Sequence, residues 1–300
     1  MQEYHVPVLL NASVDALVHD PDGIYADATF GGGGHSRAIL KKLSAKGKLV
    51  AFDRDEEALT NAPDDKRFTL VNHNFRFLKQ FMQYGKMLPV SGVLADLGIS
   101  SHQINVGERG FAHRLEGPLD MRMDRKSPLT AAAILNTYTE EKLKHIFRIW
   151  GEIPNAGRLA GLICQGRTAQ PIESTEQFKR IIAPCTPKHS PAKYLSQVYQ
   201  ALRIEVNGEM QALEELLKAS ADSIGKGGHL VIISYHSLED RMVKNFLQTG
   251  NLDGERKTDI YGNVERPFDP EPNKAIVPDE QEITANNRAR SAKMRIGVKR

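Results

Sequence analysis

The chain has few of the features that mark a secreted, membrane-bound or metal-clustering protein. It contains only two cysteines, Cys164 and Cys185, and they form no C-x-x-C or other metal-ligand spacing. Isolated thiols of this kind are typical of a reducing compartment. The start of the sequence lacks a basic segment followed by an apolar one, and no run approaches the ~18 apolar residues of a membrane helix. We therefore expect a cytoplasmic protein without disulfides, metal cluster, cleaved leader or membrane span.

A large charge imbalance is also missing. The formal net charge is +3 over 300 residues, with 26% charged and 40% hydrophobic residues. These fractions are those of an ordinary globular protein, and the composition by itself does not indicate a nucleic-acid binder. The length is sufficient for one large domain or two ordinary ones with an ample core.

A glycine-rich motif follows the first predicted strand. The run from Ile24 to Thr29 is apolar enough for a short strand, and four consecutive glycines, Gly31 to Gly34, follow one residue later. Ser36 is a candidate N-cap for the helix that comes next. Glycines in such a loop let the backbone approach a bound nucleoside closely. The motif predicts a nucleoside-cofactor site on a doubly wound α/β sheet.

A carboxylate stands where a ribose-binding residue is expected. A second predicted strand covers Leu49 to Phe52, and Asp53 at its carboxyl end lies 20 residues after Gly33. The dinucleotide pattern G-x-G-x-x-G is incomplete, because Ser36 occupies its third glycine position. S-adenosylmethionine needs no pyrophosphate cradle, so the loop favours this methyl donor over NAD. A glycine turn without any ligand is the remaining alternative.

More strands are predicted further along the chain. They cover Phe68–Val71, Val90–Leu97, 229–237 and the last ten residues, 291–300. The last of these has a basic end and is interpreted as an edge strand. The segment 258–282 is rich in Pro, Gly and acids and is interpreted as a loop. Strands that alternate with helical segments predict an α/β architecture.

A long gap between two of these strands predicts an inserted domain. From Asp96 to His229 there are 133 residues, whereas a crossover connection needs only about 30. The intervening segments carry apolar residues at intervals of three and four, as helices do. We predict a Rossmann-like S-adenosylmethionine-dependent methyltransferase domain of residues 1–104 plus 206–300. An α-helical substrate-recognition domain, 105–205, is inserted into it.

Candidate site residues lie at the carboxyl ends of the predicted strands, where ligands bind to open α/β sheets. They are the Gly31–His35 loop, Asp53, Phe75, Asp96 and Ser234–Ser237. Phe75 can stack on an adenine or fill the core, and His35 can contact the ligand or only stabilise the turn. Asp96 closes an apolar strand, where a carboxylate is costly unless it has partners. The polar segment 235–237 can face the substrate or open a helix.

The sequence that begins at Asp96, DLGISSHQ, predicts methylation of an amino group. Methyl transfer from a sulfonium is an in-line displacement, so the enzyme mainly has to align the nucleophile. An exocyclic amine on a base is a poor nucleophile, because its lone pair is delocalised into the ring. Asp96 and the hydroxyls of Ser100 and Ser101 are candidate acceptors that can hold the amine nearer to pyramidal and take its proton. This chemistry needs no metal.

The motifs together resemble those of one bacterial family. YHVPVLL, DATFGGGGHS, AFDRD, DLGISSHQ, ERGF, GPLDMRMD, QALRIEVNGE, IISYHSLEDR and RARSAKMRI are similar to the signatures of the RsmH (MraW) methyltransferases. The resemblance implies N4-methylation of a decoding-centre cytidine in 16S rRNA of the small ribosomal subunit, with S-adenosyl-L-methionine as cofactor. It also implies cofactor contacts by Gly33, Gly34, His35, Asp53, Phe75, Asp96 and Gln103.

Positive charge is concentrated in two segments. Residues 105–206 hold 15 Lys/Arg against 10 Asp/Glu, and the last 13 residues hold six Lys/Arg and no acid. Phosphate contact is a natural use of this asymmetry, and a solvated helix face explains the inserted segment equally well. Lys193 lies where the chain departs from the usual family pattern. The RNA-binding candidates are Arg109, Arg122, Arg125, Lys193, His236, Arg288 and Arg290. For the arginines of LDMRMDRK, a loop pinned by Arg–Asp pairs is the alternative.

Three functions follow from these observations. The first is an rRNA cytidine N4-methyltransferase, for which the target base has to leave its stack. The second is a methyltransferase that acts on DNA or another amine, because DLGISS does not choose the polymer. The third is a ribosome-assembly factor that binds the donor and works by docking. The sequence leaves open the oligomeric state and the choice between naked RNA and an assembled subunit.

Overall fold

The computed structural model describes residues 7–300, so the first residues of the YHVPVLL motif, 4–6, lie outside the described part of the chain. The chain forms two compact units. The first comprises the residues up to Gly98 together with Met210–Arg300, and the second is Ile99–Glu209. The limits of the second unit lie a few residues outside the predicted inserted segment, 105–205.

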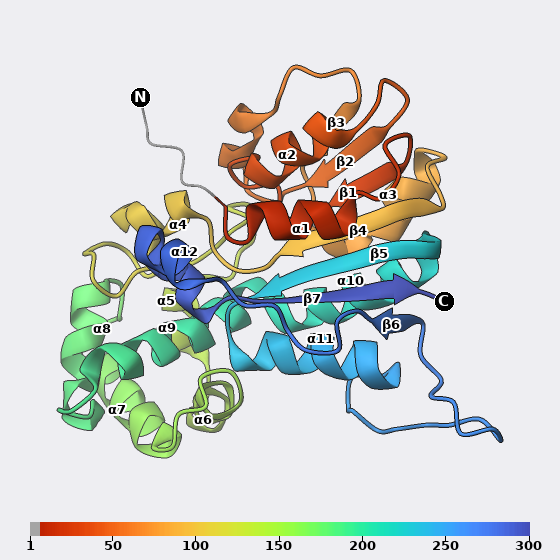
Figure 1. The fold of residues 1–300 in the computed structure, drawn as a ribbon. Coiled ribbons are helices and arrows are strands. Elements are labelled where there is room, and N and C mark those ends of the chain that lie inside the picture. The colour runs from red at the N-terminus through yellow and green to blue at the C-terminus, as the bar shows by residue number, and fades with distance from the viewer. Residues whose placement is uncertain (1–6) are drawn as a thin grey trace. The chain divides into compact units, whose positions relative to one another are not determined.

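The first unit is built on a seven-stranded sheet with the order β3-β2-β1-β4-β5-β7-β6 (Figure 1). The strands are β1 (Ile24–Asp27), β2 (Lys48–Phe52), β3 (Phe68–Val71), β4 (Val90–Asp96), β5 (Ile224–Ser234), β6 (Phe268–Pro270) and β7 (Lys293–Lys299). Neighbours from β3 to β5 are parallel, whereas β7 is antiparallel to both β5 and β6. The strand order reverses between β1 and β4, and such a switch point is where ligands bind to doubly wound sheets.

Helices cover both faces of this sheet. They are α1 (Leu10–Leu17), α2 (Gly34–Lys42), α3 (Leu78–Tyr84), α10 (Glu209–Ser223), α11 (Ser237–Thr249) and α12 (Glu280–Ala285). Val93 and Ala95 of β4 pack in an apolar cluster with residues of α3, α10 and α11. Leu94, between them in the sequence, packs with residues of α1 and α2 on the opposite face. Both faces of the strand are buried, which explains its nearly continuous apolar run. The predicted α/β sheet is confirmed.

The C-terminal part of the sheet differs from two predictions. β7 is an internal strand, because β6 pairs with its outer edge. The prediction of an edge strand at 291–300 was therefore wrong. The predicted loop at 258–282 also contains β6, which has three residues and ends at Pro270. A strand this short has no readable alternation, and proline is tolerated there because β6 lies at the edge of the sheet.

The second unit is helical. Its helices are α4 (Ser101–Asn105), α5 (Ala131–Thr137), α6 (Glu140–Ile149), α7 (Ala156–Ala169), α8 (Thr175–Ile182) and α9 (Pro191–Asn207). Hydroxyl side chains begin several of them, since Thr130 and Thr139 accept hydrogen bonds from backbone N–H groups of α5 and α6. The helices enclose a core of their own that includes Phe147, Phe178 and Leu202, each with 0% of its surface exposed.

The GPLDMRMD segment of the second unit is pinned by the end of α9. The N–H of Met123 donates to Oδ1 of Asn207 at 2.9 Å, and Nδ2 of Asn207 donates to the carbonyl of Met121 at 2.7 Å. Met121 has φ +60°, which is strained for a residue with a side chain. The buried amide of Asn207 therefore stabilises a backbone conformation that the segment would not adopt by itself.

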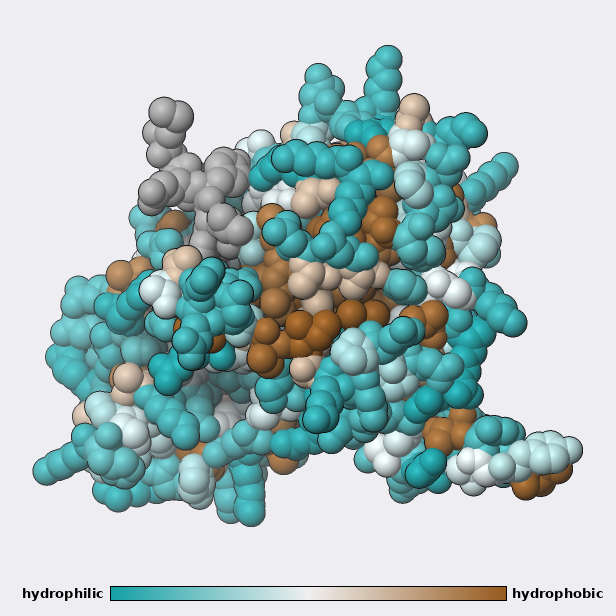
Figure 2. Space-filling model, viewed as in Figure 1, coloured by the Kyte–Doolittle hydropathy of each residue, from teal (hydrophilic) through white to brown (hydrophobic). Residues whose placement is uncertain are grey.

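Two strongly exposed apolar side chains are adjacent on one loop of the first unit. Ile260 and Tyr261, between α11 and β6, are 92% and 82% exposed. Figure 2 shows hydrophobic residues at the tip of this loop, at the lower right. Asp259 closes the loop, because its Oδ1 accepts from the N–H groups of Tyr261 and Asn263 at 2.9 Å and 2.8 Å. Among the described helices, none is both long and apolar enough to cross a membrane.

We expect Asn207→Ala to lower the free energy of unfolding of the second unit by about 1–3 kcal/mol, because two buried backbone groups lose their partner. Urea unfolding followed by far-UV circular dichroism measures the change. Asn287→Ala, at an exposed position of the first unit, is the control. Equal unfolding midpoints for the two variants would contradict the role assigned to Asn207.

Candidate active site

The glycine loop between β1 and α2 has a backbone that requires glycine. Gly31 and Gly33 have φ +51° and +74°, in the left-handed region. Gly34 starts α2, and a Cβ built on it would lie 2.3 Å from Cγ of Pro7. Glycine is therefore needed at these positions for two reasons, backbone conformation at the first two and close approach of another residue at the third.

Two side chains hold the carbonyl groups of this loop in place. Nδ2 of Asn61 donates to the carbonyl of Gly31 at 3.1 Å. The guanidinium of Arg37 donates to the carbonyl of Gly32 and, at 3.1 Å, to that of Asn61. The loop is consequently fixed before any ligand arrives, which lowers the entropic cost of binding.

Asp53 connects the loop to the end of β2. Its Oδ2 accepts from the N–H of Gly31 at 2.7 Å, and its Oδ1 accepts from the N–H of Asp55 at 2.8 Å. Burial raises the pKa of Asp53 to about 6, although both hydrogen bonds act in the opposite direction. A carboxylate has about four lone-pair positions, so Asp53 retains acceptor capacity for ribose hydroxyls.

A chain of hydrogen bonds joins the carboxyl ends of β1, β4 and β5. Ser36 donates to Oδ2 of the fully buried Asp27 at 2.6 Å, and the N–H of Thr29 donates to Oδ1 at 3.0 Å. Oγ1 of Thr29 accepts from the N–H of Asp96 at 2.7 Å, and the hydroxyl of Tyr235 donates to Oδ1 of Asp96 at 2.6 Å.

Ser36 lies inside α2, which begins at Gly34. Its predicted role as the N-cap of this helix was therefore wrong.

Asp96 and His35 face each other at the switch point. Nδ1 of His35 lies 3.8 Å from Oδ2 of Asp96, and the two side chains are 5% and 22% exposed. Burial raises the pKa of Asp96 to about 6, while His35 and the hydrogen bond from Tyr235 lower it. Nε2 of His35 is buried and has no hydrogen-bond partner among the described residues. Buried polar atoms are rarely left unpaired, so this nitrogen is suited to a ligand atom.

These groups fit a nucleoside methyl donor. The open glycine backbone and Asp53 suit the nucleoside, and Nε2 of His35, which has no partner within residues 7–300, suits a polar group at the same strand ends. Phe75 begins the short helix η2 (Phe75–Phe77) and packs half-buried against the sheet core. It retains an accessible surface and at the same time contributes to the core.

Three predicted residues belong to the second unit, around the start of α4. Oγ of Ser100 accepts from the N–H of Gln103 at 3.2 Å, and Oε1 of Gln103 accepts from the N–H of Ser100 at 3.1 Å. This reciprocal pair is a capping box, which fixes the beginning of the helix. Ser101 is the first residue of α4, and its side chain lies outside the described part of the structure.

The structure corrects one RNA-binding prediction and decides one alternative. Arg109 is only 1% exposed, and its Nη2 donates to the carbonyl of Arg122 at 3.0 Å. The prediction that Arg109 contacts RNA was wrong, because its guanidinium is inside the helical unit. Arg122 binds Asp120 with two nitrogens, at 2.8 Å and 2.7 Å, and donates to the carbonyl of Ser127 at 2.8 Å. Arg122 therefore pins its loop, which was the structural alternative.

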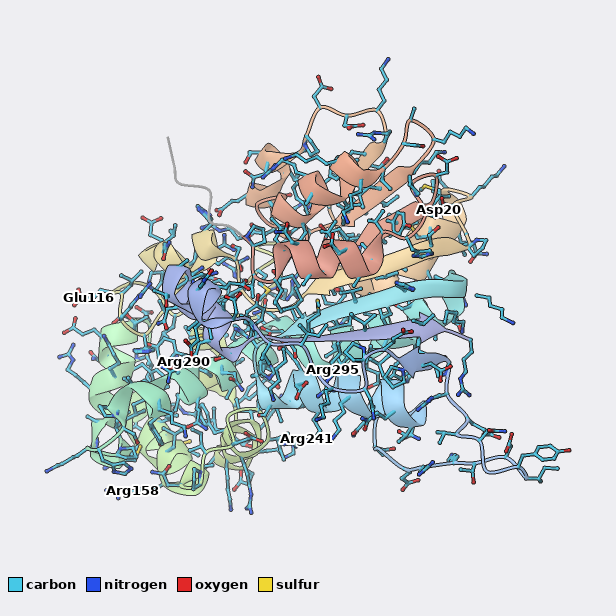
Figure 3. All side chains as sticks on the ribbon, in the orientation of Figure 1. Asp20, Glu116, Arg158, Arg241, Arg290 and Arg295 are labelled. Carbon is cyan, nitrogen blue, oxygen red and sulfur yellow. The ribbon has the colours of Figure 1, made fainter. Side chains whose placement is uncertain are left out.

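The other basic candidates divide into exposed and buried groups. Arg125, Lys193 and Arg290 are exposed, and Figure 3 labels Arg290, which lies between α12 and β7 in the chain, whereas Arg288 is half-buried. His236 is the N-cap of α11, and its Nε2 lies 3.2 Å from Oε1 of the buried Glu239. The segment 235–237 thus opens a helix, as one of the two alternatives predicted.

Sequence analysis missed the role of Tyr235. Its position at the end of β5 was recognised, but its hydrogen bond to Asp96 joins residues 139 positions apart. The only signal in the sequence is a residue with a hydroxyl group at a strand end. The contacts of Asn61 and Arg37 were also missed, because their partners are backbone carbonyl groups, which every residue carries.

The strand order, with an antiparallel β7 between β5 and β6, and the site at the switch point are those of a Rossmann-like methyltransferase. A family model described as the MraW methylase family matches residues 2–300. The chain belongs to this family. The predicted family is thereby confirmed, and with it the predicted cofactor, S-adenosyl-L-methionine.

Two relatives in sequence agree with this assignment. The chain is 52% identical over 297 residues to a protein named ribosomal RNA small subunit methyltransferase H of Bacteroides fragilis, covering 99% of this chain and 98% of the relative. It is 51% identical over 297 residues to the protein of the same name in Flavobacterium johnsoniae, with the same coverage. A solved rRNA methylase from Streptococcus thermophilus is 13% identical with a TM-score of 0.43, over 100% of this chain and 98% of that one.

We expect Asp53→Ala to weaken binding of S-adenosylmethionine at least about tenfold, because hydrogen bonds to a charged carboxylate are lost. Isothermal titration calorimetry measures the dissociation constant, and circular dichroism checks that the fold is retained. Asp64→Ala, at an exposed position of the same region, should bind like the unaltered protein. A donor affinity unchanged by Asp53→Ala would refute the ribose role.

Proposed function

We propose that the protein transfers a methyl group from S-adenosyl-L-methionine to the N4 amine of a decoding-centre cytidine in 16S rRNA of the small ribosomal subunit. Relatives that are 51–52% identical over 99% of the chain carry the name ribosomal RNA small subunit methyltransferase H. The observation that carries the choice of an amine is Asp96 at the switch point of the sheet, whose carboxylate accepts from the hydroxyl of Tyr235 and whose backbone N–H donates to Thr29.

In this proposal, the residues around the switch point have separate tasks. The donor, when bound, supplies an electrophilic methyl group on a sulfonium. Gly33, Gly34 and Asp53 bind its nucleoside part, together with Phe75 and Gln103, and His35 offers it the buried Nε2 atom. Asp96 has two partners in this proposal. It contacts the donor, and its Oδ2 accepts a hydrogen bond from the target amine.

Asp96 orients the amine and takes its proton. The nitrogen–methyl bond forms while the sulfur–methyl bond breaks, and the amine then loses one proton. The pKa of Asp96 is raised by burial to about 6, so most of it is ionised at neutral pH and can accept that proton. Ser100 and Ser101 are further candidate acceptors, and the capping box gives Ser100 a fixed orientation within α4.

The exposed cations of the two units contact RNA in this proposal. Arg125 and Lys193 of the second unit and Arg290 of the first are the predicted basic residues whose side chains are exposed. Phosphate contacts of this kind position the polymer without reading its sequence. The target cytidine has to be turned out of its stack to reach Asp96, because a stacked base keeps its amine within the helix.

The proposal is tested by methyl transfer from labelled donor to small ribosomal subunits that lack the modification, followed by nucleoside analysis. Free rRNA and DNA are assayed in parallel. N4-methylcytidine in the rRNA is the expected product. No transfer to subunits or to free rRNA, in a protein that binds the donor, would favour the docking function, and methylation of DNA alone would overturn the rRNA assignment.

We expect Asp96→Asn to lower the rate of methyl transfer by about 10²-fold or more while RNA binding persists, because the proton acceptor is lost. The rate of the unaltered enzyme should rise with pH and level off above about pH 6, where Asp96 is ionised. Single-turnover assays between about pH 5 and pH 8 measure both. Equal rates for the two proteins would exclude Asp96 as the acceptor.

We expect Arg125→Ala to reduce the salt dependence of RNA binding by about one unit of slope, since one phosphate contact is lost. Fluorescence anisotropy at several salt concentrations gives the slope. Arg122→Ala is the matched comparison. It should lower the stability of the second unit through its bonds to Asp120 and leave the slope unchanged. A reduced slope for Arg122→Ala together with an unchanged slope for Arg125→Ala would show that Arg122 is the RNA contact.

A further inference from the structure

Tyr235 is held in one orientation at the end of β5. Its N–H donates to Oε2 of Glu239 at 3.0 Å, and its hydroxyl donates to Oδ1 of Asp96 at 2.6 Å. A Cβ built on Gly98 would lie 3.3 Å from Cδ2 of the ring, so the glycine backbone packs directly against it. Gly98 has φ +116°, which favours glycine at this position. Backbone, ring and hydroxyl of Tyr235 are thus all constrained.

The hydroxyl of Tyr235 is one of several groups around Asp96 that shift the pKa of its carboxyl group. Asp27 and Glu239 are carboxyl groups near Asp96 and raise its pKa, as burial does most strongly, while His35 and Tyr235 lower it. Tyr235 is the group among these that hydrogen-bonds directly to the carboxylate. Burial raises the pKa of Tyr235 itself far above its ordinary value. The hydroxyl therefore keeps its proton and acts as a permanent donor.

We propose that Tyr235 is a positioning residue for methyl transfer, which fixes Oδ1 of Asp96 so that Oδ2 remains for the target amine. This inference rests on the function proposed above. The proton of the amine passes to Oδ2, and Tyr235 neither gains nor loses one. Orientation of a catalytic group is a large part of catalysis when the reaction is an in-line displacement, so loss of the hydroxyl should lower the rate without abolishing it.

The variant Tyr235→Phe removes only the hydroxyl. We expect the acid limb of the rate profile to move up by about one pH unit, because the ionised form of Asp96 loses a charge-assisted hydrogen bond. We also expect a rate at about pH 7 that is lower by about tenfold, with donor affinity within about twofold of the unaltered protein. A merely structural role would lower stability and leave the pH profile in place.

Tyr25→Phe is the matched control. The hydroxyl of Tyr25 donates to the carbonyl of Asp20 at 2.9 Å, next to the amino-terminal half of β1. Its loss should lower stability while the pH profile keeps its position. A shift of the profile by Tyr25→Phe, or its absence in Tyr235→Phe, would overturn the assignment.

A second measurement separates this inference from the proposed function. The carboxyl ¹³C resonance of Asp96, followed by NMR in donor-free protein, gives its pKa directly. Tyr235→Phe should raise that pKa by about one unit whether or not rRNA is the substrate. An unchanged pKa would refute the positioning role even in an active methyltransferase. A raised pKa in a protein that methylates no rRNA would refute only the proposed function.

Discussion

The burial of two carboxylates at the carboxyl ends of neighbouring parallel strands is the constraint on which the first unit depends. Asp27 and Asp96 end β1 and β4, and burial raises the pKa of both. Such groups are stable only when their oxygens are hydrogen-bonded. Ser36 supplies such a bond from α2, and Thr29 and Tyr235 supply theirs from the segments that directly follow β1 and β5. The network that makes the burial tolerable therefore also ties together the elements that form the site.

The glycine loop is likewise held by hydrogen bonds from side chains of neighbouring segments. Its left-handed glycines leave the backbone open toward a ligand, and the side chains of Asn61, Arg37 and Asp53 satisfy its polar groups from other elements. The loop is rigid without being filled by side chains of its own. A preorganised backbone of this kind binds a ligand at a lower entropic cost than a loop that has to be ordered first.

Several long motifs of the family are structural. In GPLDMRMD, Arg122 pairs with Asp120 and the backbone is held by Asn207. In SYHSLEDR, His236 and Glu239 cap α11, while Tyr235 reaches Asp96. In these motifs, most of the polar and charged residues thus hold the backbone or cap a helix, and few of them reach the site at the ends of the strands. Arg122 and Arg125, three positions apart, accordingly differ in their surroundings, since the first is bonded to Asp120 and the second is exposed.

The sequence by itself determined the α/β class, the glycine loop, the carboxylate that follows β2 and the helical character of the inserted segment, because these follow from periodicity and from spacing along one stretch of chain. The tertiary structure decided what depends on distant partners. It buried Arg109, placed β7 inside the sheet by pairing it with β6, and brought Tyr235 to Asp96. A hydrogen bond between residues 139 positions apart leaves no local pattern. Such a contact exists only once the strands have paired.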